Sequence, residues 1–390
     1  MNFQKLSEYL HSLEREHQVP ASCCRITVDH QTVFSQSDGW MDEKKSRPVQ
    51  EQSLFRLFSA TKIVTVIATL QLIERGSLRF SDSVEKYLPE YGALRVADHY
   101  ESGRIPVVWP TSASPCHLAH HSPRIIDLLT MTAGMSYNTF AEEIQKLRKE
   151  NTGGTREGVR AIAKMPLLFD PSTRWAYGLE HDVLAAIIEI VSGLSFGTYL
   201  NRNIFEPMEI EPLYFRLKQE QKERLVKLYR FPRGQKTLMD DDGALSGSFA
   251  FTDQYESGGA GLTGSTESFS AILEALANGG IARNGQRILH SETVQLLSLP
   301  YTTGEQQADF AKAGKKGYSY GLGVRVLTDA SASRSPLGEF GWDGAAGAYW
   351  LVDLKNRLSV FYAEHIMGHI DSYFVIHPAI RDLAYEGLES

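Results

Sequence analysis

An uncharged stretch of eleven residues, 63–73, is the feature that most restricts how this chain of 390 residues can fold. A segment of this length and polarity is typical of a helix that is buried on all sides. Ser59 and Lys62 directly precede the stretch, and residues three apart lie on one face of a helix. The pattern therefore predicts a serine hydroxyl beside a lysine amino group at the edge of a core. The helix is expected to end near Arg75, with Gly76 as its cap.

Ser59 and Lys62 could act together as a nucleophile and its proton acceptor. Burial favours the neutral form of a lysine, which can accept a proton from a serine. The unpaired N–H groups at a helix N-terminus stabilise negative charge on the same oxygen. Ser59 and Lys62 also fit a serine that caps the helix, followed by a lysine whose amino group extends to water. These residues alone do not decide between a catalytic pair and a helix cap.

The hydrophobic pattern of the rest of the chain predicts an α+β protein. Apolar residues at helical spacing predict an amphipathic helix over residues 3–15. Runs rich in β-branched residues at 25–28 and 32–34 predict a β-hairpin. From about residue 80 to 240 helical and irregular patterns dominate. Residues 93–123 lack periodicity, which predicts a long irregular connection.

The order of these elements predicts two lobes. Before residue 240, the predicted helices cover residues 125–131, 138–150, 155–164, 182–192 and 196–205. After it, the sequence predicts a helix at 266–277, strands at 320–327, 349–354 and 357–362, a two-residue turn at Lys355-Asn356, and a helix at 372–388. Residues 1–58 and 241–390 would form an antiparallel sheet flanked by N- and C-terminal helices, with the mainly helical residues 59–240 inserted as an all-helical lobe. The active site would lie in the cleft between the lobes.

Composition limits the classes of partner. With 42% hydrophobic and 22% charged residues, the chain has the composition of an ordinary globular protein. A net charge of −7 argues against nucleic acid and anionic membrane surfaces as partners. The N-terminus lacks a leader pattern, so we expect a cytoplasmic protein, although a mature secreted form would have the same features. The cysteines, Cys23, Cys24 and Cys116, do not form a disulfide framework.

Two other motifs lack the context that their chemistry requires. Residues 193–197 match Gly-x-Ser-x-Gly, in which Ser195 would be a nucleophile between a strand and a helix. The preceding residues 183–191 have a helical pattern, so we expect Ser195 to cap the next helix. Residues 116–121, Cys-His-Leu-Ala-His-His, have no second group of ligands at metal spacing. For these residues we expect a solvated loop and no metal site.

Four segments, in this order and at this spacing, resemble one protein family. They are residues 58–62 (Phe-Ser-Ala-Thr-Lys), 128–134 (Leu-Leu-Thr-Met-Thr-Ala-Gly), 169–177 (Phe-Asp-Pro-Ser-Thr-Arg-Trp-Ala-Tyr) and 340–347 (Phe-Gly-Trp-Asp-Gly-Ala-Ala-Gly). Over nearly its whole length the chain resembles the serine β-lactamase and penicillin-binding-protein superfamily, in the branch of class C-like β-lactamases and related esterases. The resemblance implies a β-lactamase/transpeptidase-like fold.

The resemblance also implies roles for individual residues. Ser59 would be the acylated nucleophile, Lys62 its proton acceptor or modulator, and Tyr177 the group that passes a proton to the leaving group. Either Lys62 or Tyr177 could be the base. A tyrosine has a pKa near 10, so Tyr177 would need Lys62 nearby to lower its pKa. Gly344, which has no side chain, would let a substrate approach the backbone closely. The N–H groups of the next residue, Ala345, and of Ser59 would form the oxyanion hole.

The sequence departs from the family pattern at three substrate-binding positions. Leu179 stands where true class C β-lactamases commonly have an asparagine that contacts a substrate amide. Trp342 and Asp343 replace the lysine and threonine that bind the carboxylate of a β-lactam, and a tryptophan cannot form that ion pair. Glu339 and Asp343 would make this part of the site acidic and disfavour an anionic substrate. Family esterases resemble this chain in having tryptophan or histidine at the lysine position.

The predicted function is a serine hydrolase that works through a covalent acyl-enzyme on Ser59, without a metal or organic cofactor. The substrate would be a small ester or amide. We favour carboxylic esters over β-lactams because Leu179 and Trp342 remove the amide and carboxylate contacts. Alternative enzymes are a β-lactamase, a D-amino-acid peptidase or an acyltransferase. A further alternative is a binding protein that has the fold without turnover.

Overall fold

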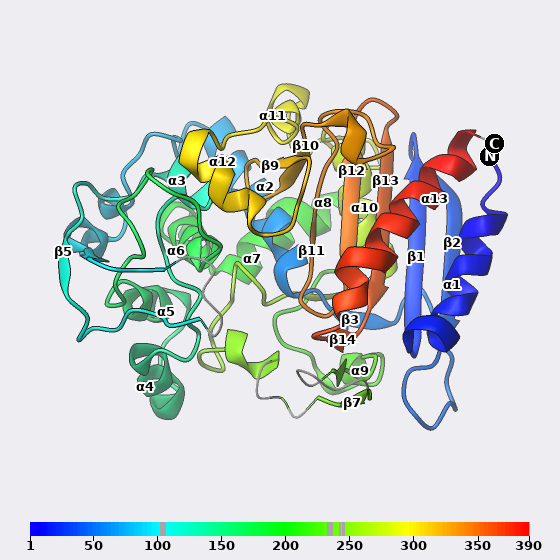
Figure 1. Cartoon of the computed structure of the whole chain (residues 1–390), viewed down its shortest axis with the longest axis horizontal. Coiled ribbons are helices and arrows are strands. Elements are labelled where there is room, and N and C mark those ends of the chain that lie inside the picture. The colour runs from blue at the N-terminus through cyan, green and yellow to red at the C-terminus, as the bar shows by residue number, and fades with distance from the viewer. Residues whose placement is uncertain (102–106, 232–236, 242, 244–245, 390) are drawn as a thin grey trace.

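The two ends of the chain form one antiparallel sheet in the computed structural model, which describes residues 1–101, 107–231, 237–241, 243 and 246–389. Its seven strands have the order β2-β1-β13-β12-β11-β10-β9 (Figure 1). The strands are β1 (Ala21–Val28), β2 (Gln31–Gly39), β9 (Tyr318–Tyr320), β10 (Arg325–Leu327), β11 (Phe340–Asp343), β12 (Tyr349–Asp353) and β13 (Leu358–Glu364). The predicted N-terminal hairpin is β1 and β2, joined through Asp29 and His30, which both have positive φ.

Helices cover both faces of this sheet. Helices α1 (Gln4–His17) and α13 (His377–Glu389) pack together on one face, and α10 (Thr266–Ala277) packs on the other (Figure 1). Successive residues of a strand point to opposite faces. Accordingly, Val360 joins the cluster with α1 and α13, whereas Phe361 joins the cluster with α10. All seven residues of β13 are buried for this reason.

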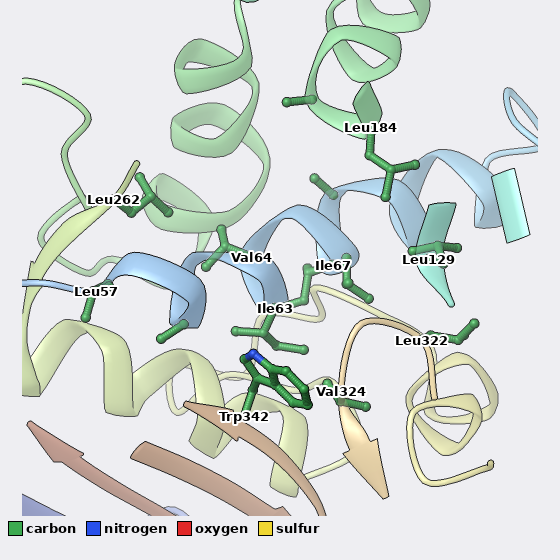
Figure 2. Packing of buried hydrophobic residues seen from close by; sticks show 14 of the residues in the cluster. Leu57, Ile63, Val64, Ile67, Leu129, Leu184, Leu262, Leu322, Val324 and Trp342 are labelled. Carbon is green, nitrogen blue, oxygen red and sulfur yellow. The ribbon is translucent and has the colours of Figure 1, made fainter. Parts of the chain in front are cut away.

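The uncharged stretch forms the centre of the core, as predicted. Helix α2 (Thr61–Glu74) is buried from its first residue to Leu72. Figure 2 shows Ile63, Val64 and Ile67 among apolar side chains from several distant segments. The other helices are α3 (Ile125–Leu129), α4 (Glu142–Glu150), α5 (Thr155–Ile162), α6 (Glu180–Ser192), α7 (Phe196–Leu200), α8 (Glu206–Met208), α9 (Gln219–Lys222), α11 (Ser291–Leu296) and α12 (Gly304–Ala311).

Among the described residues, no single helix is long and apolar enough to cross a membrane. Helix α6 and the following segment Phe196–Met208 meet the criteria of length and composition only as a pair, with a bend of 74° between them. Residues 183–188 of α6 are buried within the protein.

Three local predictions were wrong. Residues 320–327 are not one strand, because Gly321 and Gly323 form a turn that separates β9 from β10. In the segment 93–123, two short strands, β4 (Arg95–Ala97) and β5 (Cys116–Leu118), pair with each other, while residues 102–106 lie outside the described residues. The expected two-residue turn at Lys355-Asn356 spans residues 354–357, because the Asp353 carboxylate accepts the N–H groups of Lys355 and Asn356.

Of two further small sheets, one lies within the predicted sheet-plus-helix lobe and the other joins the two predicted lobes. Strand β3 (Leu54–Arg56), just before Ser59, pairs with β8 (Thr263–Ser265). Strands β6 (Tyr229–Arg230), β7 (Met239–Asp240) and β14 (Ile366–Met367) form another small sheet. Residues 229–230, which we assigned to the helical part, therefore lie beside a C-terminal strand. The division into lobes at residues 58 and 241 stays a prediction.

Candidate active site

Ser59 lies on a sharp turn at the beginning of the central helix. It is the middle residue of a single 3₁₀ turn, η1 (Phe58–Ala60), which leads directly into α2. Phe58 has a φ of 44°, a conformation that costs a bulky residue conformational energy. Such backbone strain is typical of functional sites. Because the first N–H groups of a helix lack intrahelical acceptors, the N–H of Ser59 is available to a substrate.

Lys62 is buried beside Ser59. None of its surface is exposed, so the alternative in which its amino group extends to water is wrong. Its Nζ donates a hydrogen bond to the carbonyl of Gly259 at 2.8 Å and lies 3.4 Å from Ser59 Oγ. The same nitrogen is 4.6 Å from the centre of the Tyr177 ring. The structure thus brings together the three residues that the sequence suggested for catalysis.

Tyr177 is held by Trp342. The indole Nε1–H donates to the Tyr177 hydroxyl at 2.9 Å, and the two rings stack with their centres 5.4 Å apart. Burial raises the pKa of Tyr177 well above its usual value, although hydrogen bonds with Ser59 and Trp342 oppose the increase. The cation that Tyr177 would need lies beside it, but the pKa of Tyr177 is raised and not lowered. An indole N–H can only donate, so the Tyr177 O–H stays available to donate to another group.

The loop after β11 lies against the turn that carries Ser59. A Cβ atom at Gly344 would be 2.4 Å from the carbonyl oxygen of Leu57, so only glycine fits there. The end of strand β11 can therefore pack closely against η1. Within the described part of the chain, the N–H of Ala345 donates no hydrogen bond to the protein. It can therefore serve as the second donor of an oxyanion hole, as the sequence suggested.

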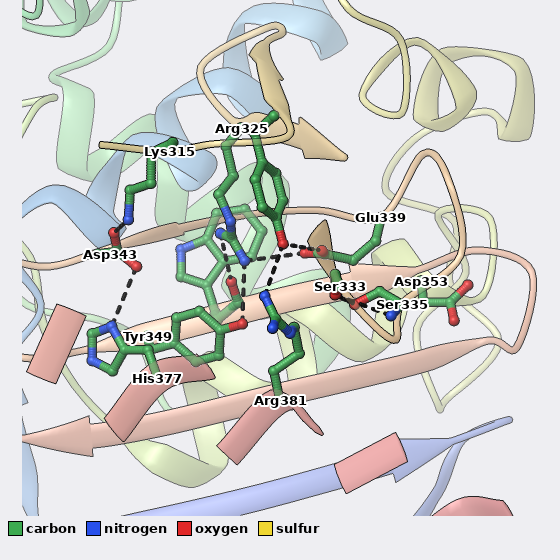
Figure 3. Close-up of polar contacts among 12 residues, drawn as sticks. Lys315, Arg325, Ser333, Ser335, Glu339, Asp343, Tyr349, Asp353, His377 and Arg381 are labelled. Atoms are coloured by element: carbon green, nitrogen blue, oxygen red, sulfur yellow. Dashed lines mark hydrogen bonds and ion pairs between the residues drawn. The ribbon is translucent and has the colours of Figure 1, made fainter. Parts of the chain in front are cut away.

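Two predicted substrate contacts lie elsewhere. Leu179 is only 2% exposed and packs in the main hydrophobic core. Asp343 forms an ion pair with Lys315, while His377 Nδ1 lies 3.5 Å from its Oδ1 (Figure 3). Burial alone would raise the pKa of Asp343, but Lys315 and His377 outweigh burial and hold the pKa well below its usual range.

The expectation of an acidic site was therefore wrong. Glu339 is 1% exposed and forms an ion pair with Arg325 at 3.1 Å inside the protein (Figure 3). Both carboxylates, which lie on either side of Trp342 in the sequence, are paired with a cation, and neither is free to repel an anionic substrate.

Comparison with known proteins agrees with the motifs. A family model described as Beta-lactamase matches residues 4–385. The chain belongs to the β-lactamase family. This β-lactamase family protein is 27% identical to the esterase EstB of Burkholderia gladioli over 375 residues, which cover 89% of this chain and 86% of the esterase. It is 26% identical to the acyltransferase calJ of Penicillium decumbens over 367 residues, which cover 87% and 82% of the two chains.

Solved structures share the fold of this family protein. The structure of EstCE1, a hydrolase with promiscuous acyltransferase activity, matches with a TM-score of 0.76 at 22% identity and covers 98% of each chain. The LovD6 mutant of simvastatin synthase from Aspergillus terreus matches with a TM-score of 0.79 at 21% identity, covering 99% of this chain and 95% of the synthase. The predicted β-lactamase/transpeptidase-like fold is confirmed.

Tyr137 is a residue of this site that the sequence analysis missed. Its ring meets the Tyr177 ring edge-on at 5.4 Å, and Lys62 Nζ lies 5.6 Å from its centre. Burial raises the pKa of Tyr137 to about 12, against the opposing effect of Lys62. Its position three residues after Gly134, at the end of the second family segment, is the signal that could have identified it.

Asp182 also belongs to the surroundings of Lys62 in this β-lactamase family protein. It lies in the first turn of α6, where its carboxylate is buried and accepts the hydroxyl of Tyr255 at 2.6 Å. A Cβ atom at Gly259 would be 2.6 Å from Asp182 Oδ2 and 3.4 Å from Lys62 Nζ, so the backbone of Gly259 lies between them. Burial raises the pKa of Asp182, and the Tyr255 hydroxyl and the nearby Lys62 oppose this increase.

Glu180 should make the stability of this family protein depend on pH. Its Oε1 accepts the N–H of Met135 at 3.3 Å, and Oε2 has no partner among the described residues. Burial raises the pKa of Glu180 to about 8, against the effects of backbone N–H groups and Lys62. The folded protein therefore holds this proton more tightly than the unfolded chain. This contribution to stability is complete below the unfolded pKa near 4.5 and is lost as the pH rises through about 8.

The variant Glu180→Gln cannot ionise and should lose this dependence. We expect it to be more stable than the wild type by about 3 kcal/mol at pH 7, with little difference at pH 4.5. Urea unfolding of the two proteins between pH 4.5 and 8 measures the difference. Parallel curves over this range would contradict the assignment of a protonated Glu180.

The rival motifs have structural roles. Ser195 Oγ accepts the N–H of Thr198 and caps α7, as predicted. In the histidine-rich segment, His117 contacts the carboxylates of Asp98 and Asp170 at 2.8 and 3.2 Å. No group of residues that could hold a metal ion was found in the described ranges.

Proposed function

We propose that the protein is a serine esterase that forms an acyl-enzyme on Ser59. The observation that carries this proposal is the 3.4 Å distance between Ser59 Oγ and the amino group of the buried Lys62, with Tyr177 packed on that amino group. Ser59 Oγ would bond to the ester carbonyl carbon while its proton passes to the amino group of Lys62, since Tyr177 already carries its own proton. The leaving alcohol would take up that proton as its C–O bond breaks. Water would then attack the acyl-enzyme and give up a proton, Ser59 Oγ would take up a proton as its bond to the acyl group breaks, and the carboxylic acid would be released.

The chemistry of the surroundings favours carboxylic esters over β-lactams. Trp342 stands at the position where β-lactamases have the lysine that binds the substrate carboxylate, and its indole N–H donates to the Tyr177 hydroxyl. Beside Ala345 lies a small apolar cluster that includes Phe58, Leu228 and Met367. An apolar acyl group would pack against this cluster, whereas a charged one would lose its hydration there. Similarity to the esterase EstB and to the acyltransferase calJ supports acyl transfer from an ester to water or to an alcohol.

Turnover of two chromogenic substrates tests the proposal. The protein is incubated separately with p-nitrophenyl butyrate and with a chromogenic cephalosporin, and also with a fluorophosphonate probe. We expect ester turnover to exceed cephalosporin turnover and the probe to label Ser59, as located by peptide mass spectrometry. Faster cephalosporin turnover would instead support a β-lactamase. Absence of both labelling and turnover would support a non-catalytic binding protein.

A further inference from the structure

The loop that carries the second oxyanion donor is held by residues of the C-terminal helix. The carbonyl oxygen of Gly344 accepts two hydrogen bonds, from the N–H of Gly347 at 3.0 Å and from the hydroxyl of Tyr373 at 2.9 Å. Tyr373 belongs to η7 (Ser372–Ile376), a π-helical turn that leads into α13. One hydroxyl from a distant segment therefore reaches the backbone next to Ala345.

The carbonyl of Gly344 and the N–H of Ala345 belong to the same peptide group. A trans peptide is planar, so these two groups point in opposite directions. A donor that fixes the carbonyl oxygen on the α13 side consequently directs the N–H of Ala345 away from that helix. A hydrogen bond to the carbonyl also polarises the peptide and strengthens its N–H as a donor.

His377 holds the other end of this loop. Its Nε2 lies 3.1 Å from the carbonyl oxygen of Gly347, and its ring stacks on Tyr349 with the ring centres 4.7 Å apart (Figure 3 shows the two rings). The Tyr373 ring meets the His377 ring edge-on at 5.4 Å. The π-helical turn runs directly into α13, so Tyr373 and His377 contact the loop from one continuous segment.

We propose that Tyr373 is a positioning residue for the oxyanion hole, which orients the Gly344–Ala345 peptide through its hydrogen bond to Gly344. The inference rests on the proposed function of Ser59. Burial raises the pKa of Tyr373, so its hydroxyl remains a donor at neutral pH. Two other bonds of the loop do not involve Tyr373, namely Gly344 N–H to Ala348 at 2.7 Å and Ile366 N–H to Ala346 at 3.0 Å. The loop should therefore keep its fold without the hydroxyl, while the Gly344–Ala345 peptide loses one of the two hydrogen bonds that orient it.

The test compares an ester with the corresponding thionoester in the variant Tyr373→Phe. Sulfur accepts hydrogen bonds poorly, so the thionoester depends little on the oxyanion hole. Since loss of a whole oxyanion donor costs about 10²–10³ in kcat, we expect a misoriented donor to cost about 10-fold in kcat with KM nearly unchanged. Thionoester turnover should change by less than about twofold. Thermal unfolding checks that the variant is folded.

The matched control is Tyr385→Phe, which removes a buried hydroxyl from the same helix. Tyr385 donates to Asp353 at 2.9 Å, and among the described residues its hydroxyl donates no hydrogen bond to the loop 344–347. This control should keep the wild-type ratio of ester to thionoester turnover. An unchanged ratio in Tyr373→Phe, or the same change in both variants, would overturn the proposal. Wild-type ester turnover that survives Ser59→Ala would instead overturn the proposed function, and the two failures are distinguishable.

Discussion

Replacement of Ser59 by alanine is expected to lower kcat/KM for p-nitrophenyl butyrate by about 10⁴-fold or more. Without its nucleophile, the site would keep only substrate binding and the oxyanion donors, which give a small part of the rate enhancement of such enzymes. The amino group of Lys62 retains its hydrogen bond to Gly259 in this variant. The fold should therefore persist, and steady-state hydrolysis combined with thermal unfolding measures the two effects separately.

The matched control for this experiment is Ser195→Ala. Ser195 is the serine of the rival Gly-x-Ser-x-Gly motif, but its Oγ caps α7. Loss of an N-cap typically costs about 1 kcal/mol of stability and should leave the turnover unchanged. If Ser195→Ala lost activity while Ser59→Ala retained it, the assignment of the nucleophile would be wrong.

The variant Glu339→Gln is expected to destabilise the protein by about 3–5 kcal/mol. Glu339 and Arg325 form an ion pair at 3.1 Å in which both side chains are almost fully buried (Figure 3). Removing the negative charge leaves the guanidinium of Arg325 without its counter-ion in a medium that solvates it poorly. Urea unfolding at neutral pH measures this loss. An exposed pair such as Arg15 and Glu16 serves as a control, and Glu16→Gln should change stability very little.

The double variant Arg325→Met/Glu339→Gln tests the cause of that loss. If the unpaired charge is responsible, removal of Arg325 in the Glu339→Gln background should restore much of the stability, because an apolar side chain needs no counter-ion. The two substitutions should therefore be strongly non-additive in a double-mutant cycle. Additive losses would indicate that packing, rather than charge, sets the cost.

Much of the fold could be predicted because its signals are local. Helix α10 has the predicted bounds, and the N-terminal hairpin and central helix formed where the hydrophobic periodicity placed them. The errors occurred where a short segment changes direction. Gly321 and Gly323 divide a run of strand-forming residues, and the pairing of β4 with β5 joins two stretches that have no periodicity of their own. Strand pairing over such separations depends on the partner as much as on the segment.

The same distinction applies to the site. Ser59 and Lys62 are three residues apart at the start of one helix, so their proximity follows from helical geometry and was determined by the sequence alone. The contact of Trp342 with Tyr177 spans 165 positions of the chain, and that of Lys315 with Asp343 spans 28. Contacts between residues so far apart in the chain depend on how the whole chain folds and not on local geometry.

The protonation of Tyr177, the charge around Asp343 and the orientation of Ala345 therefore depend on contacts between distant parts of the folded chain. Burial and the nearest partners determine a side chain's pKa, and neither can be read from the adjacent residues. The burial of the uncharged stretch after Lys62 was predictable from its residues, because eleven residues without charge leave no side of a helix for water. That burial places a serine and a lysine at the edge of the core, and the folded chain supplied the groups around them.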